Sequence, residues 1–297
     1  MKNLDIGRKI YKHFFNNVPS IAFLNEMTYS QKIPSIYLKG GFKSIIMDWD
    51  NAAEFNNYNL ELRYRTAYIK NNGKRINLLW NSSLNSYKFQ RCIYNRLPIN
   101  EYVKSIVSHK SNEYDRALIL YGTDWEMFNY RPQTGEVTTG EIAKIKNILE
   151  ALLEEEGINL VRPEEVLEKI PPAEEVSIST PECPLPCKNR DDYNVIRWAV
   201  SGRDDVQINT QCYRLYNHIK DIESINGNSA EVNSLWKSLC HLWGSDYRTK
   251  TTNEKHYYFR NNMGDKLTKA ISFKERKILK NFLPYSQTCL LYTSPSP

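Results

Sequence analysis

Short, uninterrupted apolar runs in the first half of the chain predict buried strands. They cover residues 20–24, 44–47, 76–80 and 117–121. Runs of this length are typical of strands buried on both faces of a parallel sheet. Apolar residues at helical spacing between them predict helices over residues 5–15, 33–38 and 100–109. This alternation favours a parallel α/β fold, either a barrel or an open sheet.

The second half of the chain is predicted to be mainly helical. The clearest helix covers residues 139–156, where apolar residues recur at helical spacing and Gly157 provides the stop. A short strand over residues 158–161 and a helix opening at Pro163 follow. Further helices are predicted over residues 208–222, 230–242 and 273–282. We therefore expect a partial barrel over residues 1–190, ending in the Pro-rich stretch 171–190, and a helical subdomain over residues 191–288.

Composition and charge exclude several classes of protein. The 297 residues are 41% hydrophobic and 25% charged, which is ordinary for a globular protein. No apolar stretch approaches the roughly 18 residues of a membrane span, and the N-terminus lacks the apolar core of a signal peptide. We therefore expect a cytoplasmic protein with no membrane partner. The net charge of +6 is dispersed along the chain, so no nucleic-acid partner is expected.

The cysteines predict neither a metal site nor a cofactor. Only Cys183 and Cys187 are close in sequence, and two prolines stiffen the loop between them. No second pair of cysteines or histidines completes a zinc site. Free thiols are therefore the expectation, with no metal and no cofactor.

Residues 289–297 are out of character with the preceding helical pattern. They carry no charge and resemble the translation of a sequencing adapter. We expect this tail to make almost no contacts with the rest of the chain, and the sequence to be a fragment of a longer protein.

Two acidic residues come just after predicted strands. Glu26 follows the run 20–24, and Asp124 follows the run 117–121. The carboxyl ends of parallel strands meet at one edge of a sheet or barrel, where active sites lie. A pair of carboxylates flanking a scissile bond is the equipment of a glycoside hydrolase. The alternative for each acid is that it caps a turn or a helix after its strand.

Three motifs carry a resemblance to glycoside hydrolase family 57. The segment Phe23-Leu24-Asn25-Glu26 resembles the nucleophile motif of that family, although Phe23 stands where Trp is usual. The segment Asp124-Trp125-Glu126-Met127-Phe128 resembles its acid/base motif, and Ser245-Asp246 resembles a later motif that contributes to the substrate site. The family's first motif, His-Gln-Pro on the opening barrel strand, is absent.

The resemblance implies an incomplete (β/α)7-type parallel barrel followed by a helical subdomain. It also implies a retaining enzyme of the α-amylase or 4-α-glucanotransferase type that acts on α-glucans. In that mechanism Glu26 is the nucleophile and Asp124 is the acid/base, with their carboxyls about 5–5.5 Å apart. Hydrolysis and transglycosylation share one glycosyl-enzyme intermediate, so the sequence leaves both open.

Aromatic and acidic residues near the predicted strand ends, near the later motif and at the start of the helical subdomain are candidate sugar contacts. They are Asp48, Trp49, Trp80, Trp125, Trp198, Trp243 and Asp246. The alternative is that the tryptophans belong to the core and the aspartates cap turns. Two rival functions stay open: a non-catalytic carbohydrate-binding fragment and a polysaccharide deacetylase-like barrel. The latter requires Asp-Asp and His-x-x-x-His metal motifs, and the sequence has no such combination.

Overall fold

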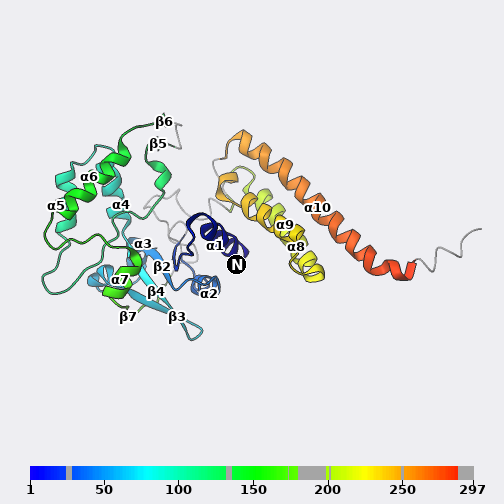
Figure 1. Ribbon diagram of the computed structural model, residues 1–297, viewed down its shortest axis with the longest axis horizontal. Helices are drawn as coiled ribbons and strands as arrows, with labels where there is room; N and C mark the ends of the chain where they lie inside the picture. The colour runs from blue at the N-terminus through cyan, green and yellow to red at the C-terminus, as the bar shows by residue number, and fades with distance from the viewer. Residues whose placement is uncertain are drawn as a thin grey trace, which may run out of the picture. The chain divides into compact units, whose positions relative to one another are not determined.

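A computed structural model describes residues 1–24, 29–131, 136–172, 174–179, 199–200, 202–248 and 251–286 (Figure 1). Within these ranges the side chains of Asn51, Glu54, Glu126, Arg131 and residues 277–286 are left out of the description. The chain divides into two compact units. The first holds Tyr11–Val195, and the second combines Lys2–Ile10 with Ile196–Pro297. Helix α1 (Lys2–Phe15) is divided between them.

The first unit is built on an open five-stranded sheet in the order β1-β2-β4-β3-β7. Its strands are β1 (Ile21–Phe23), β2 (Ser44–Asp48), β3 (Ala67–Asn71), β4 (Lys74–Asn81) and β7 (Glu174–Glu175). Strands β1, β2 and β4 are parallel, as the apolar runs predict. Strand β3 runs antiparallel to β4, and β7 pairs parallel to β3.

The centre of this sheet is buried on both faces. Ile45 and Met47 of β2 and Ile76 and Leu78 of β4 have no exposed surface. Because both faces are covered, these strands have little polar alternation, and that is why the sequence pattern finds them.

The β3–β4 hairpin is a feature that the apolar pattern does not reveal. Its loop is Asn72-Gly73, with φ angles of 49° and 74°. A two-residue hairpin loop with both φ angles positive matches the right-handed twist of the strands, and Asn-Gly is its preferred sequence.

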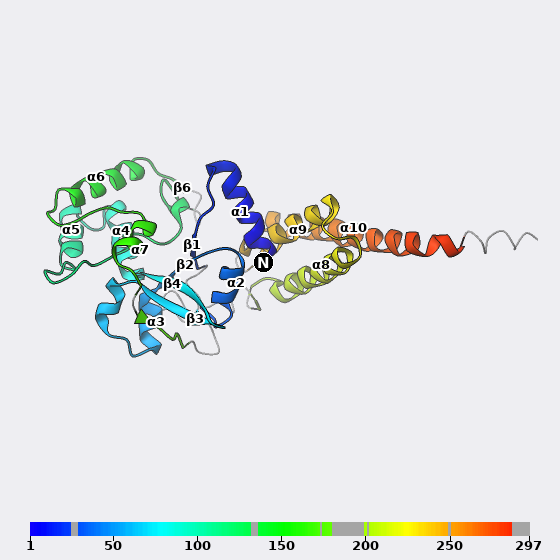
Figure 2. The same ribbon diagram turned by 60° about the horizontal axis from the view of Figure 1, so that its bottom comes forward.

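Helices and short elements complete the first unit (Figures 1 and 2). The helices are α2 (Ile33–Lys39), α3 (Trp49–Phe55), α4 (Ser83–Ile93), α5 (Ile99–Val107), α6 (Glu141–Leu153) and α7 (Pro163–Lys169). The short elements are the 3₁₀ turns η2 (Leu60–Tyr64) and η3 (Trp125–Met127) and the strands β5 (Tyr130–Arg131) and β6 (Glu136–Val137). Helices α4, α5 and α6 share one apolar core, to which Tyr121 and Phe128 contribute.

Two predicted strands are wrong. Residues 117–121 and 158–161 form no strand in the structure. Leu118, Leu120 and Ile158 instead pack, partly buried, against the core of α4, α5 and α6. An apolar run can therefore mark a loop segment lying on helices as well as a strand within a sheet.

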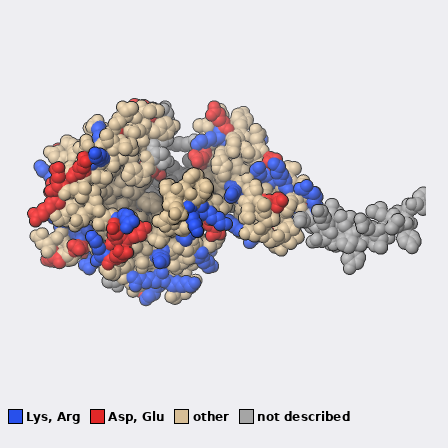
Figure 3. Space-filling view, viewed as in Figure 1, with Lys and Arg blue, Asp and Glu red and all other residues tan. Residues whose placement is uncertain are grey.

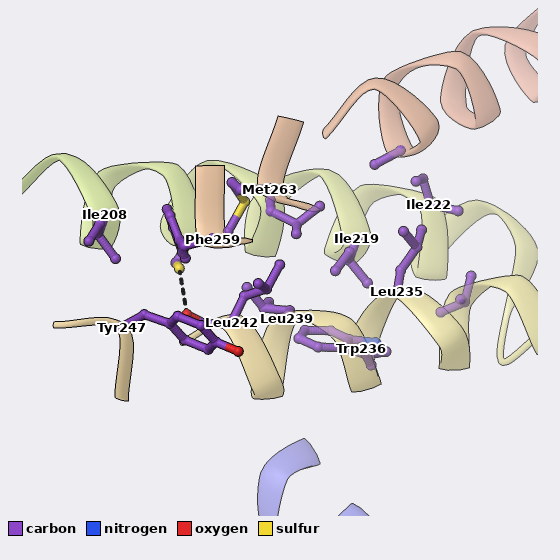
Figure 4. Packing of buried hydrophobic residues seen from close by; sticks show 14 residues of the cluster. Ile208, Ile219, Ile222, Leu235, Trp236, Leu239, Leu242, Tyr247, Phe259 and Met263 are labelled. Atoms are coloured by element: carbon purple, nitrogen blue, oxygen red, sulfur yellow. Dashed lines mark hydrogen bonds between the residues drawn. The ribbon is translucent and has the colours of Figure 1, made fainter. Parts of the chain in front are cut away.

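The second unit is helical, with α8 (Asp205–Asn226), α9 (Ala230–Leu242), η5 (Ser245–Tyr247) and α10 (Asn253–Ser286). Buried residues of α8 recur every three or four positions: Ile208, Cys212, Leu215, Ile219 and Ile222. They face apolar side chains of α9 and α10, as Figure 4 shows. The predicted helix 230–242 is confirmed, and the one at 273–282 is part of the longer α10.

The start of α1 belongs to this helical core. Ile6 packs against it, Lys2 pairs with Glu223 at 2.6 Å, and the Lys2 Nζ atom lies 5.7 Å from the ring centroid of Trp236. The predicted helix over residues 5–15 is thus confirmed within α1, and Lys2–Ile10 is the part that belongs to the second unit.

Candidate active site

Three parallel strands of the first unit end at the same edge of the sheet. Phe23 closes β1, Asp48 closes β2 and Asn81 closes β4. Phe23 pairs with Ile46, and Asp48 pairs with Asn81. Because parallel strands point the same way, the segments that follow them emerge together. This edge is where parallel α/β proteins place their sites.

The acid/base motif is attached to this edge through Gly122. A Cβ atom on Gly122 would lie 2.3 Å from Asn81 Oδ1 and 3.0 Å from Phe23 Cε2. The backbone N–H of Gly122 donates to Ser86 Oγ at 3.1 Å, and Asn81 Nδ2 donates to its carbonyl at 3.5 Å. Any side chain at this position would force Asn81 and Phe23 to move, since the approach is close. Gly122 therefore brings the Asp124 segment against the ends of β1 and β4.

Asp124 lies two residues beyond this contact, just before η3, and its side chain is exposed. Its backbone carbonyl accepts a hydrogen bond from Tyr121 Oη at 2.8 Å. Trp125 packs edge-on against Tyr121 and Phe128, with ring centroids 5.3 and 5.6 Å apart. It nevertheless stays 56% exposed, so one aromatic surface beside Asp124 is open to a ligand.

Glu26, the predicted nucleophile, lies outside the described residues. The residues around it are anchored: Leu24 is buried and its N–H donates to Ile46 O at 3.1 Å, and Tyr29 is buried as well. Its separation from Asp124 stays a prediction. The side chain of Glu126 lies outside the description too.

Asp48 has a structural role in the described geometry. Its side chain is fully buried, and Oδ1 accepts hydrogen bonds from Ser83 N at 2.8 Å and Ser83 Oγ at 2.6 Å. Asp50 Oδ2 accepts from Leu84 N at 3.2 Å, and Ser82 Oγ accepts from Asn85 N at 3.3 Å. The first three amides of α4 are thus capped by side chains. A sugar could bind Asp48 only if this cap opened.

Trp49 and Trp80 form part of the core beneath the strand ends. They are 4% and 5% exposed, and their rings meet edge to face at 5.2 Å. Tyr58 contacts both rings, and its hydroxyl donates to Ser177 O at 2.7 Å. Burial raises the pKa of Tyr58 to about 12, with a further contribution from Tyr29. Both tryptophans therefore support the edge rather than offer an open stacking face.

The candidates of the second unit are placed differently from one another. Trp243 is partly buried against the helical core, and its Nε1 donates to Asn209 Oδ1 at 2.9 Å. Asp246 is exposed and pairs with Lys255 at 2.9 Å. Trp198 lies outside the described residues. Their predicted sugar contacts stay predictions, as does that of Trp125.

Sequence reasoning missed Asn81, Ser86 and Gly122 as parts of the site. Asn81 was visible as the polar residue that ends an apolar run, and Gly122 as the glycine just before the acid. Nothing in the sequence linked the two, because 40 residues separate them and the contact is made only in the fold.

The predictions of no metal site and no membrane span can be compared with the described residues alone. In them, no cluster of three or more His, Cys, Asp or Glu side chains could hold a metal ion, and no helix is long and apolar enough to cross a bilayer. Cys183 and Cys187 lie outside the description. Basic and acidic side chains both occur across the face in Figure 3, and the lack of a nucleic-acid partner stays a prediction.

Solved structures with similar folds come from carbohydrate-active enzymes. The 4-alpha-glucanotransferase of Thermococcus litoralis has a TM-score of 0.64 at 14% identity, covering 90% of this chain and 44% of that one. The alpha-amylase AmyC of Thermotoga maritima has a TM-score of 0.63 at 12% identity, covering 93% and 63%. For an alpha-mannosidase of Enterococcus faecalis the values are 0.62 and 12%, covering 93% and 31%. The chain thus spans less than half of the glucanotransferase structure.

This likeness confirms the expected fold, an incomplete α/β barrel with a helical region after it. No curated protein sequence matches the chain. The sequence profile of Glycosyl hydrolase family 57, however, matches residues 2–179, which is more than half of the chain. The chain therefore belongs to glycosyl hydrolase family 57.

Proposed function

We propose that this chain is the catalytic part of a retaining glycoside hydrolase or transglycosylase that acts on α-glucans. The observation that carries the proposal is the close contact of Gly122 with Phe23 and Asn81. It attaches the segment of the proposed acid, Asp124, to the end of the strand that leads to the proposed nucleophile, Glu26. The segment that carries Asp124 is therefore held beside the end of the strand after which Glu26 follows in the sequence. A pair of carboxylates on either side of the scissile bond is what a retaining mechanism requires.

The proposed reaction is a double displacement. The carboxylate of Glu26 attacks the anomeric carbon while Asp124 donates its proton to the departing glycosidic oxygen. An ester between Glu26 and the sugar results. Asp124, now a carboxylate, removes a proton from water or from a sugar hydroxyl, whose oxygen attacks the anomeric carbon and releases Glu26. Entry of water gives hydrolysis, and entry of a sugar gives transfer.

The proposed substrate class is supported by family membership and by an exposed aromatic side chain. Glycosidases use aromatic faces to stack on sugar rings, and Trp125 offers such a surface beside Asp124. Two neighbours are named as a glucanotransferase and an amylase, which favours α-glucans, while the third is named as a mannosidase. The fold alone therefore does not identify the sugar of the substrate.

The test compares substitutions in the full-length gene product on two substrates. Glu26→Gln should abolish turnover of maltoheptaose, because an amide cannot form the ester intermediate. Asp124→Ala should lose most activity on maltoheptaose but much less on an α-maltosyl fluoride, whose leaving group departs without a proton. Asp115→Asn, an exposed acid on the same segment, is the matched control and should change neither rate.

Azide gives the two roles different products. With the fluoride substrate, azide added to Glu26→Ala should give a β-glycosyl azide, because it replaces the nucleophile directly. Added to Asp124→Ala it should give the α-glycosyl azide, because it attacks the ester intermediate from the other face. Continued turnover by Glu26→Gln, or equal losses on both substrates for Asp124→Ala, would refute the assignment. Binding of maltoheptaose without any turnover would favour the non-catalytic carbohydrate-binding alternative.

A further inference from the structure

The C-terminal end of the segment that carries Asp124 is fixed by a reciprocal pair of hydrogen bonds. We call residues 121–129 the acid loop. The backbone N–H of Asn129 donates to Glu141 Oε2 at 2.7 Å, and the backbone N–H of Glu141 donates to Asn129 Oδ1 at 3.0 Å. Glu141 is the first residue of α6. The end of the acid loop and the start of α6 therefore cap each other.

Asn at position 129 and Glu at position 141 both suit this arrangement. Asn129 has a φ angle of 59°, a left-handed conformation that Asn tolerates better than most residues. Glu141 is 6% exposed, and its carboxylate lies at a helix N-terminus, where the helix dipole favours negative charge. Its own N–H is one of the helix-initial amides that lack a partner within the helix. Each residue thus satisfies a backbone group of the other.

These bonds act at close range on Asp124. Four residues separate Asp124 from Asn129, and they are held as well. Phe128 is 5% exposed and its N–H donates to Trp125 O at 3.2 Å, while Tyr94 Oη donates to Met127 O at 3.2 Å. The near end is fixed at Gly122. A loop held at both ends can keep an exposed carboxylate in one direction without burying it.

We propose that Glu141 is a positioning residue for the acid/base. Through Asn129 it fixes the exit of the acid loop, and so the direction in which Asp124 delivers its proton. This inference rests on the proposed function, since it assigns Glu141 to the step that Asp124 performs. Glu141 itself need not touch the substrate.

The experiment measures kcat/KM of the full-length protein on maltoheptaose and on an α-maltosyl fluoride. Glu141→Ala should reduce the maltoheptaose value roughly ten- to hundredfold, the usual cost of a misplaced catalytic group. The fluoride value should fall far less, because that leaving group needs no proton. The ratio of the two values, measured on one preparation, is independent of the fraction that is folded. Glu101→Ala, in the first turn of α5 and exposed, is the matched control and should leave the ratio unchanged.

Further variants separate positioning from folding. Glu141→Gln keeps an oxygen that can accept from Asn129 N–H and should restore most of the ratio. Asn129→Gly keeps the left-handed backbone but removes the oxygen that accepts from Glu141 N–H, so an intermediate ratio is expected. In an Asp124→Ala background, Glu141→Ala should cost nothing more on maltoheptaose, because the group that it positions is gone.

Equal losses on both substrates for Glu141→Ala, or a further loss in the Asp124→Ala background, would overturn the inference. The two proposals fail separately. If Asp124→Ala affects both substrates alike, the proposed function is wrong. If Asp124→Ala shows the contrast and Glu141→Ala does not, only the role of Glu141 is wrong.

Discussion

At the scale of single residues, Gly122 decides where the acid loop begins. Its φ angle is not positive, so its conformation does not demand glycine. The demand is spatial, because the ends of β1 and β4 occupy the position of a side chain. The nearest atoms belong to the side chains of Asn81 and Phe23, so these side chains would have to move to admit a methyl group, and that of Asn81 is buried.

We predict that Gly122→Ala destabilises the protein and lowers activity. The added methyl would lie 2.3 Å from Asn81 Oδ1, and overpacking of this kind costs about 1–3 kcal/mol. Gly264→Ala in α10 is the control, since a Cβ there meets nothing within 4 Å and Ala favours a helix by about 1 kcal/mol. Chemical denaturation measures both changes. Unchanged stability of Gly122→Ala would mean that Asn81 moves aside easily.

His109 offers a second residue-scale test. Its Nδ1 lies 2.7 Å from Tyr64 Oη, and its pKa is lowered by burial and then by the positive charges of Arg63, Lys88 and Arg116. The unfolded chain therefore binds this proton more readily than the folded one. The stabilisation is present above the ordinary pKa of about 6.5 and is lost as the pH falls below it toward the folded-state pKa.

We predict that His109→Gln flattens the pH dependence of stability just below pH 6.5. Unfolding free energies of the natural chain and the variant, measured between about pH 7 and pH 5, give the difference that belongs to His109. Other histidines titrate in both proteins and cancel. Identical slopes would show that His109 does not contribute.

At the scale of elements, α4 joins the strand ends to the acid loop. Its N-terminus is capped by Asp48, Asp50 and Ser82, and three residues into the helix Ser86 accepts from Gly122 N. The helix therefore transmits the position of β2 to the loop that carries Asp124.

We predict that Asp48→Ala is more destabilising than Ser82→Ala. The Asp48 side chain is fully buried and accepts from both the amide and the hydroxyl of Ser83, so its loss removes two hydrogen bonds to a charged group, at about 1.5–3 kcal/mol each. Loss of the Ser82 cap should cost about 1 kcal/mol. Thermal unfolding ranks the two variants, and the reverse order would contradict the proposed cap.

Strands with an uninterrupted apolar run and helices with apolar residues at helical spacing were predictable from the sequence, and elements defined by turn chemistry or by partners were not. Strands β1, β2 and β4 follow from their apolar runs. The β3–β4 hairpin was not predicted because Lys70, Lys74 and Arg75 interrupt the apolar pattern on both sides of the turn. The sequence Asn72-Gly73 is nevertheless typical of a hairpin turn. The run at residues 117–121 was misassigned because periodicity does not say whether a sheet or a set of helices receives an apolar segment.

At the scale of the whole molecule, the family match covers the first unit almost entirely. Its residues, 2–179, include both proposed catalytic acids, while Trp243 and Asp246 lie in the helical unit beyond it. The proposed catalytic acids and these two proposed sugar contacts therefore belong to different units.

We predict that the carboxyls of Glu26 and Asp124 lie about 5–5.5 Å apart when substrate is bound, as a retaining mechanism requires. A crystal structure of Asp124→Asn with a bound maltooligosaccharide measures the separation, taken from the Glu26 carboxyl carbon to the amide carbon that replaces the Asp124 carboxyl carbon. A separation near the 6.5–9.5 Å of inverting enzymes would indicate an inverting mechanism instead. A separation above roughly 12 Å would mean that the two acids do not act on the same bond.

The way in which the acid loop is held has a consequence for exchanging parts between relatives. Four of its hydrogen bonds join loop backbone to side chains that belong to other elements: Asn81, Ser86, Tyr94 and Glu141. A loop grafted alone from another family member would lack the side chains that form hydrogen bonds with its backbone. The transplantable module is therefore the loop together with these four residues, and chimaeras built that way should retain activity where simple loop swaps fail.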